Sequence, residues 1–481
     1  MNESVINPSR LRRLIRLRRL CGNRKFWKSV LTLALPIALQ NLLTSSFSLV
    51  DTVMLGSLGE VALSSVGMAG QWSWLLNLVL FGFNSGASIF IAQYWGIRDI
   101  RRIHNAHGMQ LCSVVPICAL FTAVALLLPK QVVSIFNSDP VIVESGASYL
   151  RIAAFSYIAI GISNCCFTLL RSTETVTVPM AISGFSTVAN AVLNYVLIYG
   201  KLGLPALGIR GAAVATVISS WMSPLLLLLW TVCKKGNLLR ISPLKMLRGT
   251  DRSFALNYYK ISSPVLINET LWGLGTVILN IVYGQMGAEW YSAITIEKTV
   301  DNVFFSFFVG LCGACTVFVG KSVGAGFIVR AKRESRRFLL LVPTLTTLFV
   351  LFIIPCRSVL VEVFNLTGSL SAETQRLAEH ALVINALFQY IRLMPYMFIV
   401  GIFRSGGDTL AGLIFEICTL WMLSIPLTYL SAFVWKLPFE SVFLIMLSGE
   451  DVVKTILCLH RYRSGKWIRP VTGAGTKHTE S

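Results

Sequence analysis

The sequence carries the same helix-breaking and loop residues twice, in the same order, at a spacing of 228 positions. The pairs that keep this spacing are Pro36 with Pro264, Gly56 with Gly284, Gly59 with Gly287, Gly82 with Gly310, Gly96 with Gly324, and Arg102 with Arg330. The spacing widens to 233 where Arg171-Ser172 returns as Arg404-Ser405. Glycine, proline and arginine hold the register, so the repeat is not a by-product of two apolar segments looking alike. A parallel duplication predicts two lobes that enclose a site near the middle of a membrane.

The low content of charge indicates that lipid, and not water, surrounds most of the chain. Hydrophobic residues make up 54% of the 481 residues and charged residues only 13%, whereas a soluble domain has about 25% charged residues. Apolar stretches of ~20 residues, long enough to cross a bilayer as a helix, recur along nearly the whole chain. The expected spans are residues 30–55, 64–93, 105–128, 148–170, 176–199, 209–233, 258–284, 291–320, 337–356, 378–402, 410–433 and 440–460. We therefore predict an all-α membrane protein with twelve transmembrane helices in two pseudo-symmetric six-helix lobes, related by an axis along the membrane normal.

The net charge of +20 lies in short loops and at the chain ends, so it is a topology signal and not a nucleic-acid-binding surface. The positive-inside rule places the basic loops and both termini in the cytoplasm. The predicted segments are a basic N-terminal segment at 1–28, a first lobe at 29–233, a linker at 234–257, a second lobe at 258–462 and a C-terminal tail at 463–481. Within the first segment, Leu11 to Leu20 is either an interfacial helix held by anionic headgroups or a disordered tail.

One acid lies in the first span, where an ionised carboxylate costs several kcal/mol unless it meets water, a partner or a proton. Asp51 is either a proton or cation site, or a carboxylate that caps a helix end at the membrane interface. Asn190 and Asn194 in the fifth span are four residues apart and share one helical face. Their amides can bind a hard cation or a carboxylate such as Asp51, or they only join helices.

Three further acids lie in the seventh and eighth spans. Glu269 follows Pro264, and this proline and its repeat partner Pro36 are expected to bend the helix that opens each half. Glu269 is either a substrate-cation or proton site, or a protonated acid in an interhelical hydrogen bond. Glu297 and Asp301 are one helical turn apart. Either they line a cavity that attracts cations, or Lys298 between them neutralises one of them locally and the group is structural.

Several stretches together resemble the multidrug and toxic compound extrusion family of transporters. They are Leu35-Pro36, Val50-Asp51-Thr52-Val53-Met54-Leu55-Gly56, Leu193 to Gly200, Gly208 to Thr216, and Phe403 to Thr409. The resemblance covers residues 28–460 and thus all the expected spans. It implies an antiporter in the inner membrane of a bacterium, with both termini cytoplasmic. Such a protein exports cationic or amphipathic drugs or metabolites in exchange for inward H⁺ or Na⁺, by alternating access of two lobes.

The resemblance also implies a cation or proton site in the first lobe. Asp51, Asn190, Asn194 and Thr216 match its positions, and Asn194 stands where some members have a second Asp. A lone carboxylate carries one proton or holds Na⁺ weakly, so the coupling ion is left open between H⁺ and Na⁺.

The second lobe departs from the pattern of the sodium-type members. No carboxylate lies at the expected tenth-span position near Leu393, and Arg392 lies beside that position instead. We expect Arg392 either to pair with Glu269 or to contact an anionic group of the substrate. Glu269, Glu297, Asp301 and Arg392 are therefore the predicted polar set of the second-lobe cavity.

Two other functions stay open. A lipid-linked oligosaccharide flippase of the same broad superfamily would need a basic central cavity for its diphosphate, whereas these spans hold acids. A membrane-embedded enzyme or receptor is disfavoured because HExxH, a nucleophile elbow, a P-loop and clustered histidines are missing. His104 and His107 are expected at the interface rather than as metal ligands.

We expect no enzyme activity, no cofactor and no metal, apart from Na⁺ if it binds at the Asp51 cluster. The expected partners are a small cationic or amphipathic substrate and membrane lipid, without nucleic acid. The protein is expected to be a monomer.

Overall fold

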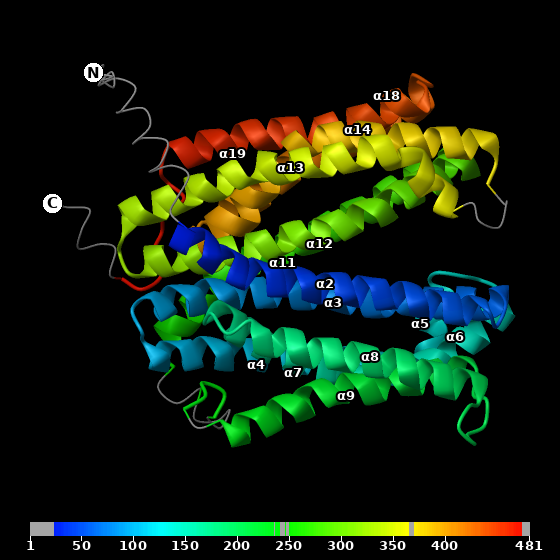
Figure 1. Cartoon of the computed structure of the whole chain (residues 1–481), viewed down its shortest axis with the longest axis horizontal. Helices are drawn as coiled ribbons and strands as arrows, with labels where there is room; N and C mark the ends of the chain where they lie inside the picture. Colours follow the sequence, from blue (N-terminus) through cyan, green and yellow to red (C-terminus); the bar gives the residue numbers. More distant parts are fainter. Residues whose placement is uncertain (1–23, 235, 241–245, 247–249, 365–369, 474–481) are drawn as a thin grey trace, which may run out of the picture. The chain divides into compact units, whose positions relative to one another are not determined.

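The computed structural model describes residues 24–234, 236–240, 246, 250–364 and 370–473, and the regular structure in these ranges is helical (Figure 1). The helices of the first half are α2 (Arg24–Gly56), α3 (Glu60–Gly96), α4 (Ile100–Leu127), α5 (Pro129–Ser134), α6 (Pro140–Ala153), α7 (Tyr157–Ser172), α8 (Thr177–Tyr199) and α9 (Ile209–Cys233). Those of the second half are α11 (Arg252–Met286), α12 (Ala288–Gly324), α13 (Ile328–Phe364), α14 (Ala372–Tyr396), α15 (Arg404–Gly406), α16 (Thr409–Glu416), α17 (Ile425–Tyr429), α18 (Phe439–Leu447) and α19 (Val453–Arg463). Shorter helical turns join some of them into longer rods, namely η1 (Ala154–Ser156), η2 (Met397–Phe403), η3 (Ile417–Ser424), η4 (Leu430–Val434) and η5 (Ser448–Val452).

Membrane-spanning helices account for nearly all of the described chain, as the hydropathy pattern predicts. Eleven helical segments among the described residues are long and apolar enough to cross a membrane. The last predicted span is also helical, from Phe439 to Arg463, but its middle is the wider π-helical turn η5, which contains Glu450 and Asp451. Helices suit a bilayer because each one satisfies its own backbone hydrogen bonds without water. The prediction of an all-α membrane fold is confirmed.

The duplication seen in the sequence is repeated in the helix bounds. Helices α3 and α12 are both 37 residues long, and they begin and end at positions 228 apart. Helices α4 and α13 also begin 228 apart. The turn before each of these helices contains a left-handed residue at the matching position, Arg98 with φ 58° and Gly326 with φ 77°. Two copies of one helix–turn–helix pattern are therefore present.

Capping residues explain why the fourth and tenth helices begin earlier than their apolar runs predict. The Asp139 side chain accepts a hydrogen bond from the Val141 backbone N–H at 2.8 Å, and α6 then begins with a proline. In the second half the Ser371 hydroxyl accepts from the Thr374 backbone N–H at 3.1 Å. Such caps satisfy donors that a helix start leaves free, so each helix extends beyond the apolar stretch.

The described chain divides into two compact units. One contains residues 39–276 together with Thr409–Glu416, and the other contains the remaining described residues. Two of the division points lie inside a continuous helix, after Ala38 in α2 and after Thr276 in α11. This is a different division from the predicted lobes at 29–233 and 258–462, which stay a prediction.

Each unit contains a close helix crossing at one of the repeated glycines. A Cβ atom added at Gly82 in α3 would lie 2.8 Å from the Leu266 Cα of α11. One added at Gly310 in α12 would lie 2.6 Å from the Ala34 backbone oxygen of α2. Small residues let membrane helices approach to backbone contact, which increases van der Waals packing. The repeated glycines thus hold the first helix of one half against the second helix of the other half.

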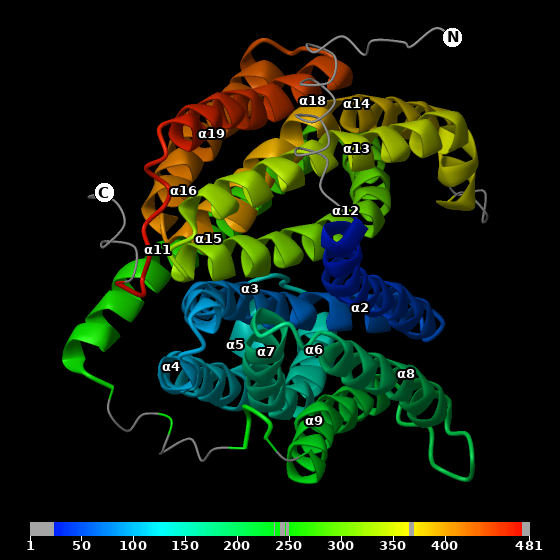
Figure 2. The ribbon, with the colours of Figure 1, turned by 60° about the vertical axis from the view of Figure 1, so that its left-hand side comes forward.

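The core of each unit consists of large apolar side chains. In the unit with residues 39–276, Leu76, Leu80 and Tyr157 are fully buried in one cluster. In the other unit, the rings of Phe304 and Phe349 stack with their centroids 3.9 Å apart. Figures 1 and 2 show α8 beside α9 in the first of these units and α13 beside α14 in the second.

The segment after α19 is bound to its unit and is not a free tail as far as residue 473. Trp467 is fully buried and stacks on Tyr462. The Arg469 backbone N–H donates to the Gly406 carbonyl at 2.6 Å. Arg461 forms two hydrogen bonds with the buried Asp408 carboxylate, at 2.7 and 3.1 Å. The part of the predicted tail beyond residue 473, like the predicted interfacial helix at Leu11 to Leu20, lies outside the described residues.

The described part of the predicted linker packs against the start of α4. The His104 ring Nε2 is hydrogen-bonded to the Leu238 carbonyl at 2.8 Å, and Met246 is buried. Arg102 forms an ion pair with Asp251 at 3.4 Å. The last residues of the predicted linker are helical, because α11 begins at Arg252.

The glycine crossing predicts a matched pair of stability effects on α3. Gly82→Ala should lower the stability by about 1–3 kcal/mol, because its methyl group would clash with the α11 backbone. Gly70→Ala on the same helix meets nothing within 4 Å and should change stability by less than ~1 kcal/mol. Thermal unfolding of the two purified variants in detergent measures the difference. Equal unfolding temperatures would show that the crossing is looser than described.

Candidate functional site

The first candidate site lies between α2 and α8, in the unit with residues 39–276. Asn194 donates from Nδ2 to the Asp51 Oδ1 at 2.7 Å. The same Nδ2 lies 3.3 Å from the Asn190 Oδ1. These two asparagines are on one face of α8 because they are four residues apart. The structure therefore brings Asp51, Asn190 and Asn194 together, as their positions in the sequence suggested.

Helix α9 closes the other side of this site. The Asn190 Nδ2 donates to the Ser219 hydroxyl at 3.1 Å. Thr216, one turn earlier on α9, donates to the Ala212 carbonyl of its own helix at 3.0 Å. The hydroxyl oxygen of Thr216 can still accept or coordinate with its lone pairs.

Two residues at this site were missed by the sequence analysis. Ser219 lies three residues after Thr216, so its helical spacing was a signal that could have been used. Tyr149 of α6 interacts with Thr216 and lies within electrostatic reach of Asp51. Nothing in the local sequence links Tyr149 to a residue almost one hundred positions earlier, so only the fold places it here.

The site has an acceptor oxygen that no described protein group uses. The Asn194 Oδ1 is buried and has no hydrogen-bond partner within the described part of the chain. Asp51 is half-buried and forms no ion pair with any described cationic side chain. A protonated carboxyl group could donate to a free amide oxygen, and Na⁺ could be coordinated by carboxylate, amide and hydroxyl oxygens. The chemistry of this set suits either a proton or Na⁺.

A second polar cluster lies in the other unit, between α12 and α14. Asp301 accepts hydrogen bonds from the Asn385 Nδ2 at 3.2 Å, from the Gln389 amide, and from the Arg392 Nη1 at 3.0 Å. The three donors follow one face of α14. Arg392 also donates to the Asn385 Oδ1 at 3.0 Å. Asp301 is thus neutralised by a cation and held by two amides.

Another member of the predicted second set, Glu297, lies on the same helix as Asp301. Glu297 lies one turn before Asp301, is only 2% exposed, and its Oε1 has no partner among the described residues. The lysine between them, Lys298, donates to the Asn280 Oδ1 at 2.6 Å. The ion pair that neutralises Asp301 therefore comes from α14, and not from the neighbouring lysine that local spacing suggested.

Glu269 and the two prolines lie on the helices that are shared between the units. Glu269 is buried on α11, in the part of that helix that belongs to the unit of Asp51. A pairing of Glu269 with Arg392 stays a prediction. Helices α2 and α11 continue through Pro36 and Pro264, and the bending at these prolines also stays a prediction. Pro36 lies two residues before the point where α2 passes from one unit to the other.

No group of three or more His, Cys, Asp and Glu side chains in the described ranges could hold a metal ion. Of the two histidines considered in the sequence, His104 is bonded to a linker carbonyl, and His107 is fully buried with its Nδ1 3.2 Å from the Gln110 Oε1.

Sequence and structure comparisons agree on one family of proteins. A sequence profile described as MatE matches residues 36–196 and 264–430, one stretch in each half. The chain is 25% identical to the probable multidrug resistance protein NorM of Thermotoga maritima, over 92% of this chain and 93% of that protein. It is 28% identical to the multidrug resistance protein NorM of Burkholderia vietnamiensis, over 83% of this chain and 86% of that protein.

Solved structures show the same fold. A structure described as MATE in complex with MaL6 superposes with a TM-score of 0.82 at 19% identity, covering 93% of this chain and 98% of that one. An outward-facing multidrug resistance MATE family transporter of the MOP superfamily gives the same TM-score, identity and coverage. The agreement over nearly the whole chain confirms the predicted fold class.

The Asp301 cluster leads to a prediction about stability. Arg392→Ala leaves a buried carboxylate without its cation and should cost about 3 kcal/mol, near the low end for buried pairs because Arg392 is partly exposed. The double variant Asp301→Asn with Arg392→Gln should recover most of that loss, since it removes both charges. Unfolding temperatures of the purified variants test this.

The matched control is Arg376→Gln on the same helix. Arg376 forms an exposed ion pair with Glu373 at 2.8 Å, and an exposed pair contributes about 0–1 kcal/mol. If Arg392→Ala were as stable as this control, the pair with Asp301 would have no structural role.

Proposed function

Because the chain belongs to the MatE family, we propose that it is a multidrug efflux transporter, a secondary active antiporter in the inner membrane of a bacterium. It exports cationic or amphipathic compounds from the cytoplasm in exchange for inward H⁺ or Na⁺. The names of the NorM relatives support multidrug export. The observation that carries the coupling is the Asp51 cluster, in which a half-buried carboxylate has one amide partner, Asn194, and no cationic partner among the described residues.

Asp51 is the coupling group in this proposal. In the ionised form it accepts the Asn194 N–H, as seen in the structure. A proton or Na⁺ that enters from outside neutralises the carboxylate. The Asn194 Oδ1, which has no partner among the described residues, then accepts a hydrogen bond from the protonated carboxyl group or coordinates Na⁺. Because an ionised carboxylate in a membrane is costly, neutralisation changes which helix packing is preferred. The two packings then face opposite sides of the membrane, which is alternating access.

The second cluster is assigned to the scaffold of the transport cycle. Asp301 already has Arg392 as its cation, so this pair carries no net charge that an incoming ion must cancel. Glu297 is buried, and its Oε1 has no partner among the described residues. It is therefore the member of that cluster that can accept a proton.

The contacts of the bases in the membrane-spanning helices favour this function over a flippase. A diphosphate cargo needs cations that are free to bind it. Arg392 is hydrogen-bonded to Asp301, Lys298 to Asn280, and Lys454 to Glu450 at 2.7 Å. These bases have protein partners already, whereas the Asp51 carboxylate has no basic partner among the described residues.

The proposal predicts that coupled export depends on Asp51. In proteoliposomes, an imposed gradient of H⁺ or of Na⁺ should move the organic cation ethidium through the wild-type protein. Asp51→Asn keeps the size and hydrogen bonding of the side chain but cannot change charge, so movement should fall to the rate of empty liposomes under either gradient. Which gradient drives the wild type identifies the coupling ion.

Glu60→Gln is the matched control, because Glu60 is an exposed acid in the first turn of α3, and it should leave transport unchanged. Wild-type movement by Asp51→Asn would reject Asp51 as the coupling group. A wild-type protein that moves ethidium under neither gradient, but does so on addition of ATP, would reject antiport itself.

A further inference from the structure

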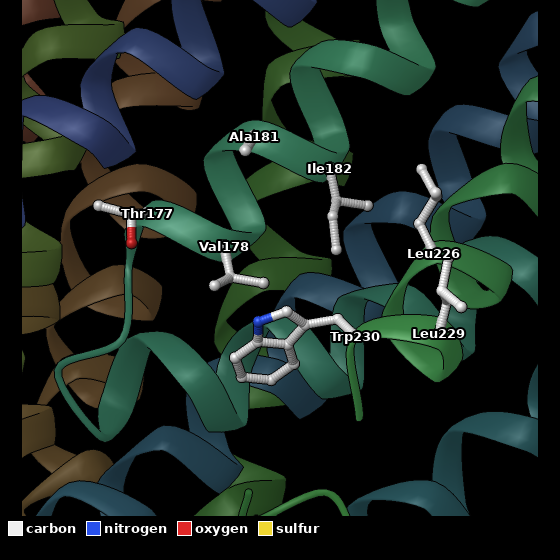
Figure 3. Close-up of a pocket in the computed structure, with 7 residues that line it drawn as sticks. All are labelled: Thr177, Val178, Ala181, Ile182, Leu226, Leu229 and Trp230. Carbon is white, nitrogen blue, oxygen red and sulfur yellow. The ribbon is translucent and has the colours of Figure 1, made fainter. Parts of the chain in front are cut away.

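A pocket of about 490 Å³ opens between α8 and α9, away from the Asp51 cluster (Figure 3). The first turns of α8 line it with Thr177, Val178 and Ile182, and the last turns of α9 line it with Leu229 and Trp230. Its volume is within the ~300–1,000 Å³ that small-molecule sites occupy in proteins. The pocket lies wholly within the unit of residues 39–276.

The inner wall of the pocket is apolar. Phe167, Leu170 and Leu227 form a buried cluster, and Val178, Ile182 and Trp230 pack against it. Figure 3 shows the indole ring of Trp230 extending from α9 beneath Val178 of α8. Such a wall accommodates a hydrocarbon chain through van der Waals packing, because within a membrane apolar contacts gain little from transfer out of water.

The rim of the pocket offers hydrogen-bond donors that no described protein group uses. The Trp230 indole N–H, the Thr177 hydroxyl and the Lys234 ammonium have no hydrogen-bond or ion-pair partner in the part of the chain that the structure describes. Lys234 lies over the Trp230 ring, with its Nζ 5.4 Å from the ring centroid. The lining residues include no carboxylate. The rim is therefore cationic and donor-rich, whereas the wall is apolar.

The sequence that follows α9 has the same charge. Residues 234–252 contain Lys234, Lys235, Arg240, Lys245, Arg248 and Arg252 against the single acid Asp251. Basic residues next to a membrane helix attract anionic headgroups, by about 1 kcal/mol for each Lys or Arg. Tryptophan is also enriched at the level of the headgroups. The rim of the pocket thus lies at the end of α9 where an anionic headgroup is favoured.

We propose that the α8–α9 pocket is a binding site for an anionic phospholipid. One acyl chain occupies the apolar wall, and the headgroup phosphate is held by Lys234, the Trp230 N–H and the Thr177 hydroxyl. The site favours an anionic ligand over a cationic one. Lys234 would repel a cationic amphiphile, and the lining residues include no acid that would attract it. The lipid is therefore a structural ligand that is distinct from the exported cargo.

Native mass spectrometry of the purified full-length protein tests the proposal. With dioleoyl-phosphatidylglycerol, which is anionic, one lipid should stay bound at a concentration where dioleoyl-phosphatidylcholine does not. Lys234→Gln should weaken phosphatidylglycerol binding about fivefold. Trp230→Phe keeps the ring and removes the N–H, so it should weaken binding by a smaller factor. Ile182→Trp fills the wall and should abolish binding.

The matched control is Lys201→Gln. Lys201 is an exposed lysine in the loop that joins the opposite ends of α8 and α9, and its loss should leave lipid binding unchanged. Glycerol 1-phosphate, which has the headgroup chemistry without acyl chains, should not compete.

Three results would overturn the proposal. They are equal retention of the two lipids, unchanged phosphatidylglycerol binding in both Lys234→Gln and Ile182→Trp, and effective competition by glycerol 1-phosphate. Retention of dodecyltrimethylammonium that is lost in Ile182→Trp would also overturn it, since it would make the pocket a cargo site. None of these results depends on whether Asp51 couples transport, so the two proposals fail separately.

Discussion

A charged side chain within membrane helices is costly unless a protein partner, water or a proton compensates its charge. Two acids of this chain differ in how far the protein compensates them. Asp301 has a full cation in Arg392 and two amides, so its charge is compensated where it stands. Asp51 has an amide from Asn194 and no described cation. In a medium of low dielectric an uncompensated carboxylate is far more costly than a compensated one. The first arrangement suits a fixed scaffold, and the second suits a group that changes its state of charge.

The duplication supplied the helices but not these acids. The position 228 residues after Asp51 is Leu279, and the position 228 residues before Asp301 is Ser73. Ser73 forms a hydrogen bond with the Tyr157 hydroxyl at 2.9 Å and carries no charge. The repeated residues are instead glycines, prolines and loop arginines, which determine helix ends and close crossings. The two halves therefore share their backbone geometry, but they differ in the charged side chains that they carry at matching positions.

Helices α2 and α11 each belong partly to one compact unit and partly to the other. The matched crossings at Gly82 and Gly310 hold them by backbone contact. Pro36 lies next to the point where α2 changes unit, whereas Pro264 lies well before the corresponding point in α11. A proline removes one backbone hydrogen bond of the helix. The two first helices thus carry their proline at the same position of the repeat and differ in where they pass from one unit to the other.

The sequence by itself determined the helical class, the approximate spans and the two-fold repeat, because these depend on hydropathy and on residues that act locally. It also placed Asn190 and Asn194 on one face, since helical spacing requires no knowledge of neighbours. Only the tertiary structure decided that Tyr149 lies near Asp51, that Arg392 pairs with Asp301, and that Trp467 is buried. These contacts connect residues far apart in the chain, and their choice follows from which helices pack together, which no local pattern encodes.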